Sequence, residues 1–317
     1  STKNSAFYAE DGCLYTAENE LFAYPLAKIA KEESIVIPNG KSLGSYAFDG
    51  LAAITDGNGE IISAVKEVKL PDTLETIPAY AFYNFRSLER IEIPEGVTQI
   101  GEYAFANCEN LSYVKIPSTL QYVGAIGANY YEENNGYTFL NCTSLKTVDF
   151  SAATGLVRFG VQAFAGSGLE SIAIPEGVDV ISTGMFYECE SLKSVTLPST
   201  ILAINKNAFY GCTSLESIAI PENVTRICDL YLGTPGISQS GSSFEGCTKL
   251  SSVTFLGNKL ECFGTRTFAG CTALKAITIP ESVVAIGTEC FKASGILSID
   301  IPEKVTALGN DKTGGTF

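Results

Sequence analysis

The sequence predicts a repeat solenoid, in which a β-rich chain winds into a superhelix and each repeat forms one rung. The first observation is a Phe, often preceded by Ala, that recurs at Phe48, Phe82, Phe105, Phe139, Phe164, Phe186, Phe209, Phe244, Phe268, Phe291 and Phe317. The second is a Pro after an apolar residue, at Pro38, Pro71, Pro94, Pro117, Pro175, Pro198, Pro221, Pro280 and Pro302. Where neighbouring repeats both keep this Pro and carry no insertion, the step is 22 or 23 residues.

A constant step of this length is typical of leucine-rich-type solenoids. One repeat cannot fold alone, because ordering its backbone costs more entropy than burial of its few apolar anchors returns. Stacking buries both flat sides of each rung, so stability becomes a sum over neighbouring rungs. We therefore expect a right-handed, β-rich superhelix of the leucine-rich-repeat type with short helical turns and an N-terminal β-hairpin cap.

Residues 1–34 are the expected cap module. Asp11-Gly12 favours a hairpin turn between two strand-like runs, Ala6–Tyr8 and Cys13–Tyr15, and Leu21–Pro25 reads as a third strand. A cap is expected because an open terminal rung would expose unpaired backbone and apolar surface. Residues 35–317 then form about eleven rungs, the last one incomplete at Phe317, in one continuous structural unit.

Residues 88–108 are the standard rung. Leu88, Ile91 and Ile93 have the spacing of inward-facing residues on a short strand. Pro94 ends that strand because it has no backbone donor. The apolar pair that follows in the sequence, Val97 and Ile100, predicts a second short strand. The segment from residue 103 to residue 108 is expected to form a single helical turn that closes the rung.

Six cysteines share one repeat position, three residues after the Phe: Cys108, Cys142, Cys189, Cys212, Cys247 and Cys271. Small, weakly polar residues at this position predict a ladder of buried thiols, because a free Cys behaves as a small hydrophobe. Parallel side chains on neighbouring rungs hold their Cβ atoms farther apart than a disulfide prefers. Disulfides and a metal site are the two less favoured alternatives.

Composition limits the function classes. The net charge is −14, and without a basic patch a nucleic-acid partner is not expected. The absence of His excludes His-based catalysis and His metal sites, so no catalytic, cofactor or metal residue is assigned. No apolar run reaches the ~18 residues of a membrane span, so direct membrane insertion is not expected. The start at Ser1 fits either a cytosolic chain or removal of a leader before Ser1.

Acidic residues after the Pro form a second row, at Asp72, Glu95, Glu176, Glu222, Glu281 and Glu303. Stacked carboxylates are possible Ca²⁺ ligands. Solvated turns are the favoured interpretation, because Ser118 and Ser199 interrupt the row.

Three repeats carry insertions, at residues 51–63, 124–137 and 228–242. The last two occupy the same repeat position, and their Gly, Asn and Ser content predicts surface loops. Insertions in solenoids map to one side and often bind ligands. Neutral drift is the alternative, since lengthening a loop costs little free energy.

The candidate ligand contacts combine strand and insertion residues. Their outward strand positions and their Tyr and Arg content suit a protein interface, whereas the outward positions of the later rungs are mostly Ser, Thr and Ala. The candidates are Arg90, Glu92, Tyr113, Lys115, Tyr130, Tyr131, Tyr137 and Tyr231.

The pattern LxxIxIPxxVxxIGxxAFxxC, as in residues 88–108, resembles the BspA-like bacterial leucine-rich-repeat family. The N-terminal pattern of Phe7, Asp11-Gly12, Leu14-Tyr15 and Tyr24-Pro25 is similar to a module of the same family. The resemblance covers nearly the whole chain. It implies a secreted or surface-attached bacterial protein, in some members an adhesin, with no catalytic residues and no common ligand.

These observations lead to one hypothesis and one alternative. The hypothesis is a monomeric, non-enzymatic, extracellular or cell-surface protein that presents a solenoid platform to a protein or glycan ligand, with no cofactor. The alternative is a structural spacer segment of a larger surface protein, with no ligand of its own.

Overall fold

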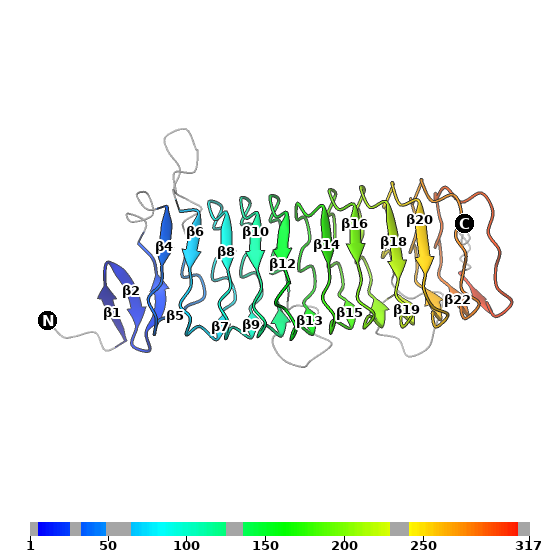
Figure 1. Ribbon diagram of the computed structural model, residues 1–317. Helices are drawn as coiled ribbons and strands as arrows, with labels where there is room; N and C mark the ends of the chain where they lie inside the picture. The colour runs from blue at the N-terminus through cyan, green and yellow to red at the C-terminus, as the bar shows by residue number, and fades with distance from the viewer. Residues whose placement is uncertain (1–5, 26–32, 49–64, 125–135, 229–240, 310–317) are drawn as a thin grey trace, which may run out of the picture. The chain divides into compact units, whose positions relative to one another are not determined.

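The computed structural model describes residues 6–25, 33–48, 65–124, 136–228 and 241–309 (Figure 1). Strands and turns, without any helix, make up these ranges. The chain divides into two compact units, Ser1–Leu156 and Val157–Phe317, and each is described by itself.

The N-terminal unit begins with an antiparallel hairpin, in which β1 (Phe7–Glu10) pairs with β2 (Cys13–Thr16) around Asp11-Gly12. β3 (Glu20–Ala23) extends this sheet antiparallel to β2. β3 also pairs in parallel with β5 (Ser42–Leu43), which belongs to the first repeat. The hairpin is thereby hydrogen-bonded into the repeats that follow.

The repeats of the N-terminal unit contribute two rows of parallel strands (Figure 1). The first row is β4 (Ser34–Val36), β6 (Glu67–Lys69), β8 (Arg90–Glu92), β10 (Tyr113–Lys115) and β12 (Thr147–Asp149). The second row contains β7 (Thr76–Ile77), β9 (Gln99–Ile100) and β11 (Tyr122–Val123). In β4, β6 and β8 a buried aliphatic residue lies between two exposed ones, which is the alternation expected of a half-buried strand.

The C-terminal unit is built in the same way. Its longer strands are β14 (Ser171–Ala173), β16 (Ser194–Thr196), β18 (Ser217–Ile220) and β20 (Ser252–Phe255), paired as β14–β16 and β18–β20. Its two-residue strands are β13 (Arg158–Phe159), β15 (Val180–Ile181), β17 (Ala203–Ile204), β19 (Arg226–Ile227), β21 (Cys262–Phe263), β22 (Ala285–Ile286) and β23 (Ala307–Leu308). The last six of these pair in parallel in sequence order.

The anchoring Phe residues form the centre of each stack. In the N-terminal unit, Phe105 stacks on Phe82 with ring centroids 4.9 Å apart and on Phe139 at 5.3 Å. In the C-terminal unit, Phe209 lies between Phe186 at 5.3 Å and Phe244 at 5.1 Å. All these rings are fully buried. The Phe residues that the sequence predicts as repeat anchors therefore lie in the hydrophobic core.

The expected helical turn before the Cys is not a helix in the described residues. Tyr103 and Asn107 have φ angles of 52° and 60°, whereas a helix needs φ near −63° at every residue. The amides of Tyr103, Phe105 and Asn107 donate to carbonyls of the next repeat. Successive tight turns therefore replace the helix, because alternate amides serve the neighbouring rung.

The cysteine ladder is confirmed. All six side chains are buried, and each thiol donates to the carbonyl of the Phe in the preceding repeat, as Cys108 does to Phe82 at 3.1 Å and Cys212 to Phe186 at 3.1 Å. None of the ten cysteines, all within the described ranges, forms a disulfide. The Sγ atoms of Cys228 and Cys262, which lie off this ladder, approach to 3.4 Å.

Candidate functional site

Four of the predicted contact residues lie together on two neighbouring strands of the N-terminal unit. β8 carries Arg90 and Glu92, and β10 carries Tyr113 and Lys115. The parallel register places Tyr113 beside Arg90 and Lys115 beside Glu92. Because residues two apart on a strand point to the same side, the four side chains share one surface. We call this set the β8–β10 cluster.

The β8–β10 cluster is held by contacts among its own members. The Arg90 guanidinium carbon lies 4.1 Å from the Tyr113 ring centroid, which is a cation–π contact. Arg90 also forms an ion pair with Glu92, and Lys115 Nζ lies 3.6 Å from the other Glu92 oxygen. The three charged side chains remain 45–47% exposed, so they are ordered yet accessible to a partner.

A third strand extends the cluster. The Tyr113 hydroxyl donates to Asp149 Oδ2 on β12 at 3.1 Å, and the Ser151 amide donates to Asp149 Oδ1. Hydrogen bonds from Ser151 lower the pKa of Asp149. The hydrogen bond from Arg90 lowers the pKa of Glu92. Partial desolvation, followed by the bond to Asp149, raises the pKa of Tyr113. At neutral pH the surface therefore presents cationic, carboxylate and phenol side chains next to one another on three neighbouring strands.

Of the four tyrosines predicted in the insertions, the structure describes Tyr137 alone. Tyr137 lies on a turn segment and stacks on Tyr103, with ring centroids 4.7 Å apart. Within the described ranges no contact links Tyr137 to the β8–β10 cluster. Tyr130, Tyr131 and Tyr231 lie outside the described residues.

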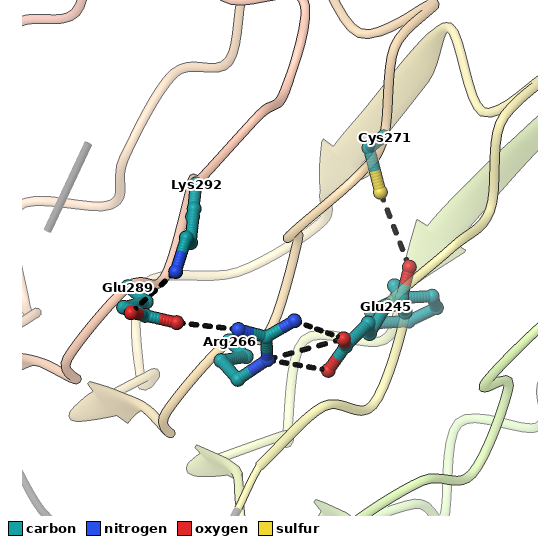
Figure 2. Close-up of polar contacts among 6 residues, drawn as sticks. Glu245, Arg266, Cys271, Glu289 and Lys292 are labelled. Atoms are coloured by element: carbon teal, nitrogen blue, oxygen red, sulfur yellow. Dashed lines mark hydrogen bonds and ion pairs between the residues drawn. The ribbon is translucent and has the colours of Figure 1, made fainter.

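A second charged cluster, in the C-terminal unit, was not expected from the sequence (Figure 2). Arg266 Nε donates to both carboxylate oxygens of Glu245, at 3.1 and 3.0 Å. Its Nη1 bonds to Glu289, whose other oxygen accepts from Lys292 Nζ at 2.7 Å. The sequence does contain a signal for this cluster, because Arg266 lies 21 residues after Glu245 and 23 residues before Glu289. Each of these separations is about one repeat. Because both carboxylates are already bonded to cations, we assign this cluster to stabilising the stacked repeats and not to binding a ligand.

Two carboxylates of the acidic row after the Pro accept hydrogen bonds from the neighbouring repeat. The Glu95 carboxylate accepts from the Ser118 amide at 3.2 Å and from its hydroxyl at 2.7 Å. Glu176 and Ser199 repeat this arrangement in the C-terminal unit. Within the described ranges, no three His, Cys, Asp or Glu side chains converge as metal ligands. Glu95 and Glu176 therefore connect the turns of neighbouring repeats.

One cavity of about 300 Å³ opens in the C-terminal unit beside β20. Its lining is Val253, Thr254, Phe255, Gly257, Asn258, Thr278 and Pro280. No charged side chain is among these residues, so the cavity offers no acid–base pair.

The described ranges contain no helix that could span a membrane.

Short parallel strands that recur at a step of 22–23 residues define a leucine-rich-repeat protein. The family model for the BspA type leucine rich repeat region matches residues 21–127, 128–232 and 237–312, in six copies. The chain therefore belongs to the BspA-type leucine-rich-repeat family. This confirms the resemblance seen in the sequence.

Solved structures of bacterial proteins support the same fold. A leucine-rich cell surface protein from Faecalibacterium prausnitzii is 25% identical, with a TM-score of 0.54 over 98% of this chain and 80% of that one. The pneumococcal vaccine antigen PcpA is 17% identical, with a TM-score of 0.58 over 96% and 83% of the two chains. A leucine-rich repeat protein from Eubacterium ventriosum is 20% identical, with a TM-score of 0.50 over 96% of both chains. No curated protein matches the chain.

Proposed function

We propose that this protein is a non-enzymatic binding protein that contacts a protein or glycan ligand through the β8–β10 cluster. The observation that supports this is the fixed arrangement of Arg90, Glu92, Tyr113 and Lys115. The three charged side chains are exposed, and Tyr113 is half-buried. Tyr and Arg are enriched where interfaces gain most of their binding energy. Side chains already ordered by their neighbours lose less entropy on binding.

The proposed location is the cell surface or the extracellular space, with a monomeric chain. It is supported by the relative from F. prausnitzii, which is described as a cell surface protein. We also propose that the repeats wind as a right-handed solenoid capped by residues 1–34, since parallel crossover connections are almost always right-handed. The insertion tyrosines Tyr130, Tyr131, Tyr137 and Tyr231 remain proposed contacts.

The test measures binding of the intact chain to immobilised extracellular-matrix proteins and to a glycan array. For any ligand found, the variant Arg90→Ala/Tyr113→Ala should weaken affinity about tenfold or more. The matched control is Ser171→Ala/Ser194→Ala, which changes outward residues paired in register on β14 and β16. Equal affinity of both variants and the native chain would rule out the β8–β10 cluster as the contact surface.

A second candidate function is that of a structural spacer. It is supported by the outward residues of β14, β16 and β18, which are Ser171, Ala173, Ser194, Thr196, Ser217 and Ala219. Such small, neutral residues make poor interface anchors. A spacer would show no ligand in either screen.

A further inference from the structure

The turn segments of the N-terminal unit carry two columns of one residue type each. Two residues before the Phe stands a Tyr in four successive repeats, and two residues after it stands an Asn in three of them. We call these residues the Tyr–Asn ridge: Tyr46, Tyr80, Tyr103, Tyr137, Asn84, Asn107 and Asn141.

The tyrosines of the ridge form one continuous stack. Ring centroids are 4.7 Å apart for Tyr46 and Tyr80, 5.0 Å for Tyr80 and Tyr103, and 4.7 Å for Tyr103 and Tyr137. Tyr46 is 45% exposed, and the other three are half-buried. The stacked rings cover one another's faces, so solvent reaches ring edges and hydroxyls. Within the described residues, these four hydroxyls form no hydrogen bond.

The asparagines form a parallel amide ladder. Asn107 Nδ2 donates to Asn84 Oδ1 at 2.9 Å, and Asn141 Nδ2 donates to Asn107 Oδ1 at 3.1 Å. Each amide still has unused donor or acceptor capacity, because an Asn side chain offers two donors and two acceptor lone pairs. The ridge thus presents phenol and amide groups at intervals of one repeat.

The fold does not require tyrosine at this position. In the C-terminal unit the same place, also with positive φ, is held by Gln162, Gly184, Asn207, Ser242, Arg266 and Glu289. A left-handed backbone favours Gly and Asn and disfavours a bulky residue. Four successive tyrosines against this preference therefore need another explanation. Stacking within the column is one, and an exposed binding surface is another.

The chemistry of the ridge narrows the partner. The amides of Tyr80, Tyr103 and Asn107 all donate to the next repeat, so no free strand edge is offered there to an extended peptide. No Lys or Arg belongs to the ridge, which argues against an anionic ligand. Rigid tyrosines combined with adaptable Asn amides are typical of recognition surfaces that use hydrogen bonds.

We infer that the Tyr–Asn ridge binds a neutral polysaccharide that runs along the stack of repeats. Hydroxyl groups of such a chain can donate to and accept from both phenols and amides. Contacts repeated along the ridge let one long chain engage several tyrosines at once, so weak single contacts give useful avidity. This surface shares no member and no recorded contact with the β8–β10 cluster in the described residues.

The test is affinity electrophoresis of the native chain in gels that contain hydroxyethyl cellulose, mixed-linkage β-glucan, galactomannan or dextran. At least one of these polysaccharides should retard the protein. The variant Tyr80→Asn/Tyr103→Asn should weaken that retardation about tenfold while it remains folded, because Asn207 already occupies this position with a φ of 57°. Tyr103→Phe, which keeps the stack and removes one hydroxyl, should lose part of the retardation.

Two controls separate this inference from other effects. Tyr187→Asn removes a stacked tyrosine of the C-terminal unit, 4.9 Å from Tyr210, and should bind as the native chain does. Arg90→Ala should also leave polysaccharide binding unchanged, which separates the ridge from the β8–β10 cluster. The inference is overturned if no polysaccharide in the panel retards the native chain. It is also overturned if the ridge variants are retarded as strongly as the native chain.

Discussion

Each ladder cysteine combines burial with a hydrogen bond that its own rung cannot supply. Cys189 donates to the Phe164 carbonyl at 3.0 Å and lies 3.3 Å from the Ser167 hydroxyl. The thiol is small enough for the core and adds a second donor to the Phe164 carbonyl, which also accepts from the Ser167 amide at 3.1 Å. Burial raises the pKa of Cys189 to about 11, so its protonated form is part of the folded state.

This raised pKa predicts a loss of stability at alkaline pH. The contribution of this protonated thiol to folding stability is complete below the ordinary thiol pKa of 9.0. It is lost as pH rises toward 11, because in that range the thiol loses its proton in the unfolded chain but keeps it in the folded one. At pH 10 the loss is about 1.4 kcal/mol for one thiol. Urea unfolding of the native chain and of Cys189→Ala at pH 8 and pH 10 should show a smaller decline in the variant.

Cys189→Ser provides the control, because it keeps a small polar group that does not titrate in this range. Its decline between pH 8 and pH 10 should equal that of Cys189→Ala. If both variants lose as much stability as the native chain, ionisation of Cys189 contributes nothing.

Arg266 also bonds to partners from neighbouring repeats (Figure 2). Replacing it in Arg266→Met leaves the carboxylates of Glu245 and Glu289, 15% and 16% exposed, without their shared cation. The expected cost is about 1 kcal/mol, reduced by solvent because the Arg266 side chain is 37% exposed. Thermal unfolding at low and high salt should show a difference that shrinks with salt.

Arg266→Lys should lie between the two, since Lys keeps the charge but loses the two-pronged geometry. Lys292 first, and Arg266 after it, hold the pKa of Glu289 below its ordinary value. That contribution is present above the ordinary carboxyl pKa and is lost as pH falls through the lowered one. An Arg266→Met variant as stable as the native chain at low salt would contradict the assigned role.

At the scale of elements, the strands were predictable and the turns were not. The step between Ile91 and Val114 is fixed by the sequence, and the structure pairs these residues in register. The sequence predicts a helical turn at residues 103–108, whereas the structure has a left-handed backbone at Tyr103. A Tyr, unlike a Gly, does not indicate such a backbone. Hydrogen bonds from alternate amides to the next repeat enforce that backbone. The sequence of a single repeat does not indicate these bonds.

The candidate site was predictable to the same extent. Outward positions on one-repeat spacing brought Arg90, Glu92, Tyr113 and Lys115 together, because register follows from the repeat. Their mutual contacts, such as the Arg90–Tyr113 stack, depend on rotamers that sequence does not specify. The Tyr–Asn ridge was missed because its members, except Tyr137, lie outside the insertions and the strands.

One lysine of the first repeat contacts the N-terminal hairpin through its side chain. Lys41 Nζ donates to Tyr8 at 2.5 Å and to Glu10 at 2.6 Å, and it lies 4.5 Å from the centroid of the Tyr15 ring. The bond to Glu10 raises the pKa of Lys41, so it stays charged throughout the neutral range. Lys41→Met should therefore release β1 and β2 from the first repeat and increase amide hydrogen exchange in residues 6–25.

The matched control is Lys69→Met, which changes an exposed Lys on β6. Exchange in residues 6–25 should then be unchanged. If Lys41→Met also left that exchange unchanged, the strand pairing of β3 with β5 alone would hold the hairpin.

For the whole molecule, the division into two contact units bears on cooperativity. A net charge of −14 spreads repulsion over a chain in which each repeat is stabilised by its immediate neighbours. Such arrays can lose two-state behaviour, and local stability then varies along the chain. A lesion in one unit should therefore be felt mainly there.

This expectation can be tested with two equivalent lesions. Phe105→Ala and Phe209→Ala each remove a fully buried ring stacked between two others, at a cost of about 3–5 kcal/mol. Hydrogen exchange should rise around residues 82–124 in the first variant and around residues 186–228 in the second, with little change in the other unit. If either substitution raised exchange equally across both units, the protein would unfold as one cooperative body, and nearest-neighbour stability would not describe it.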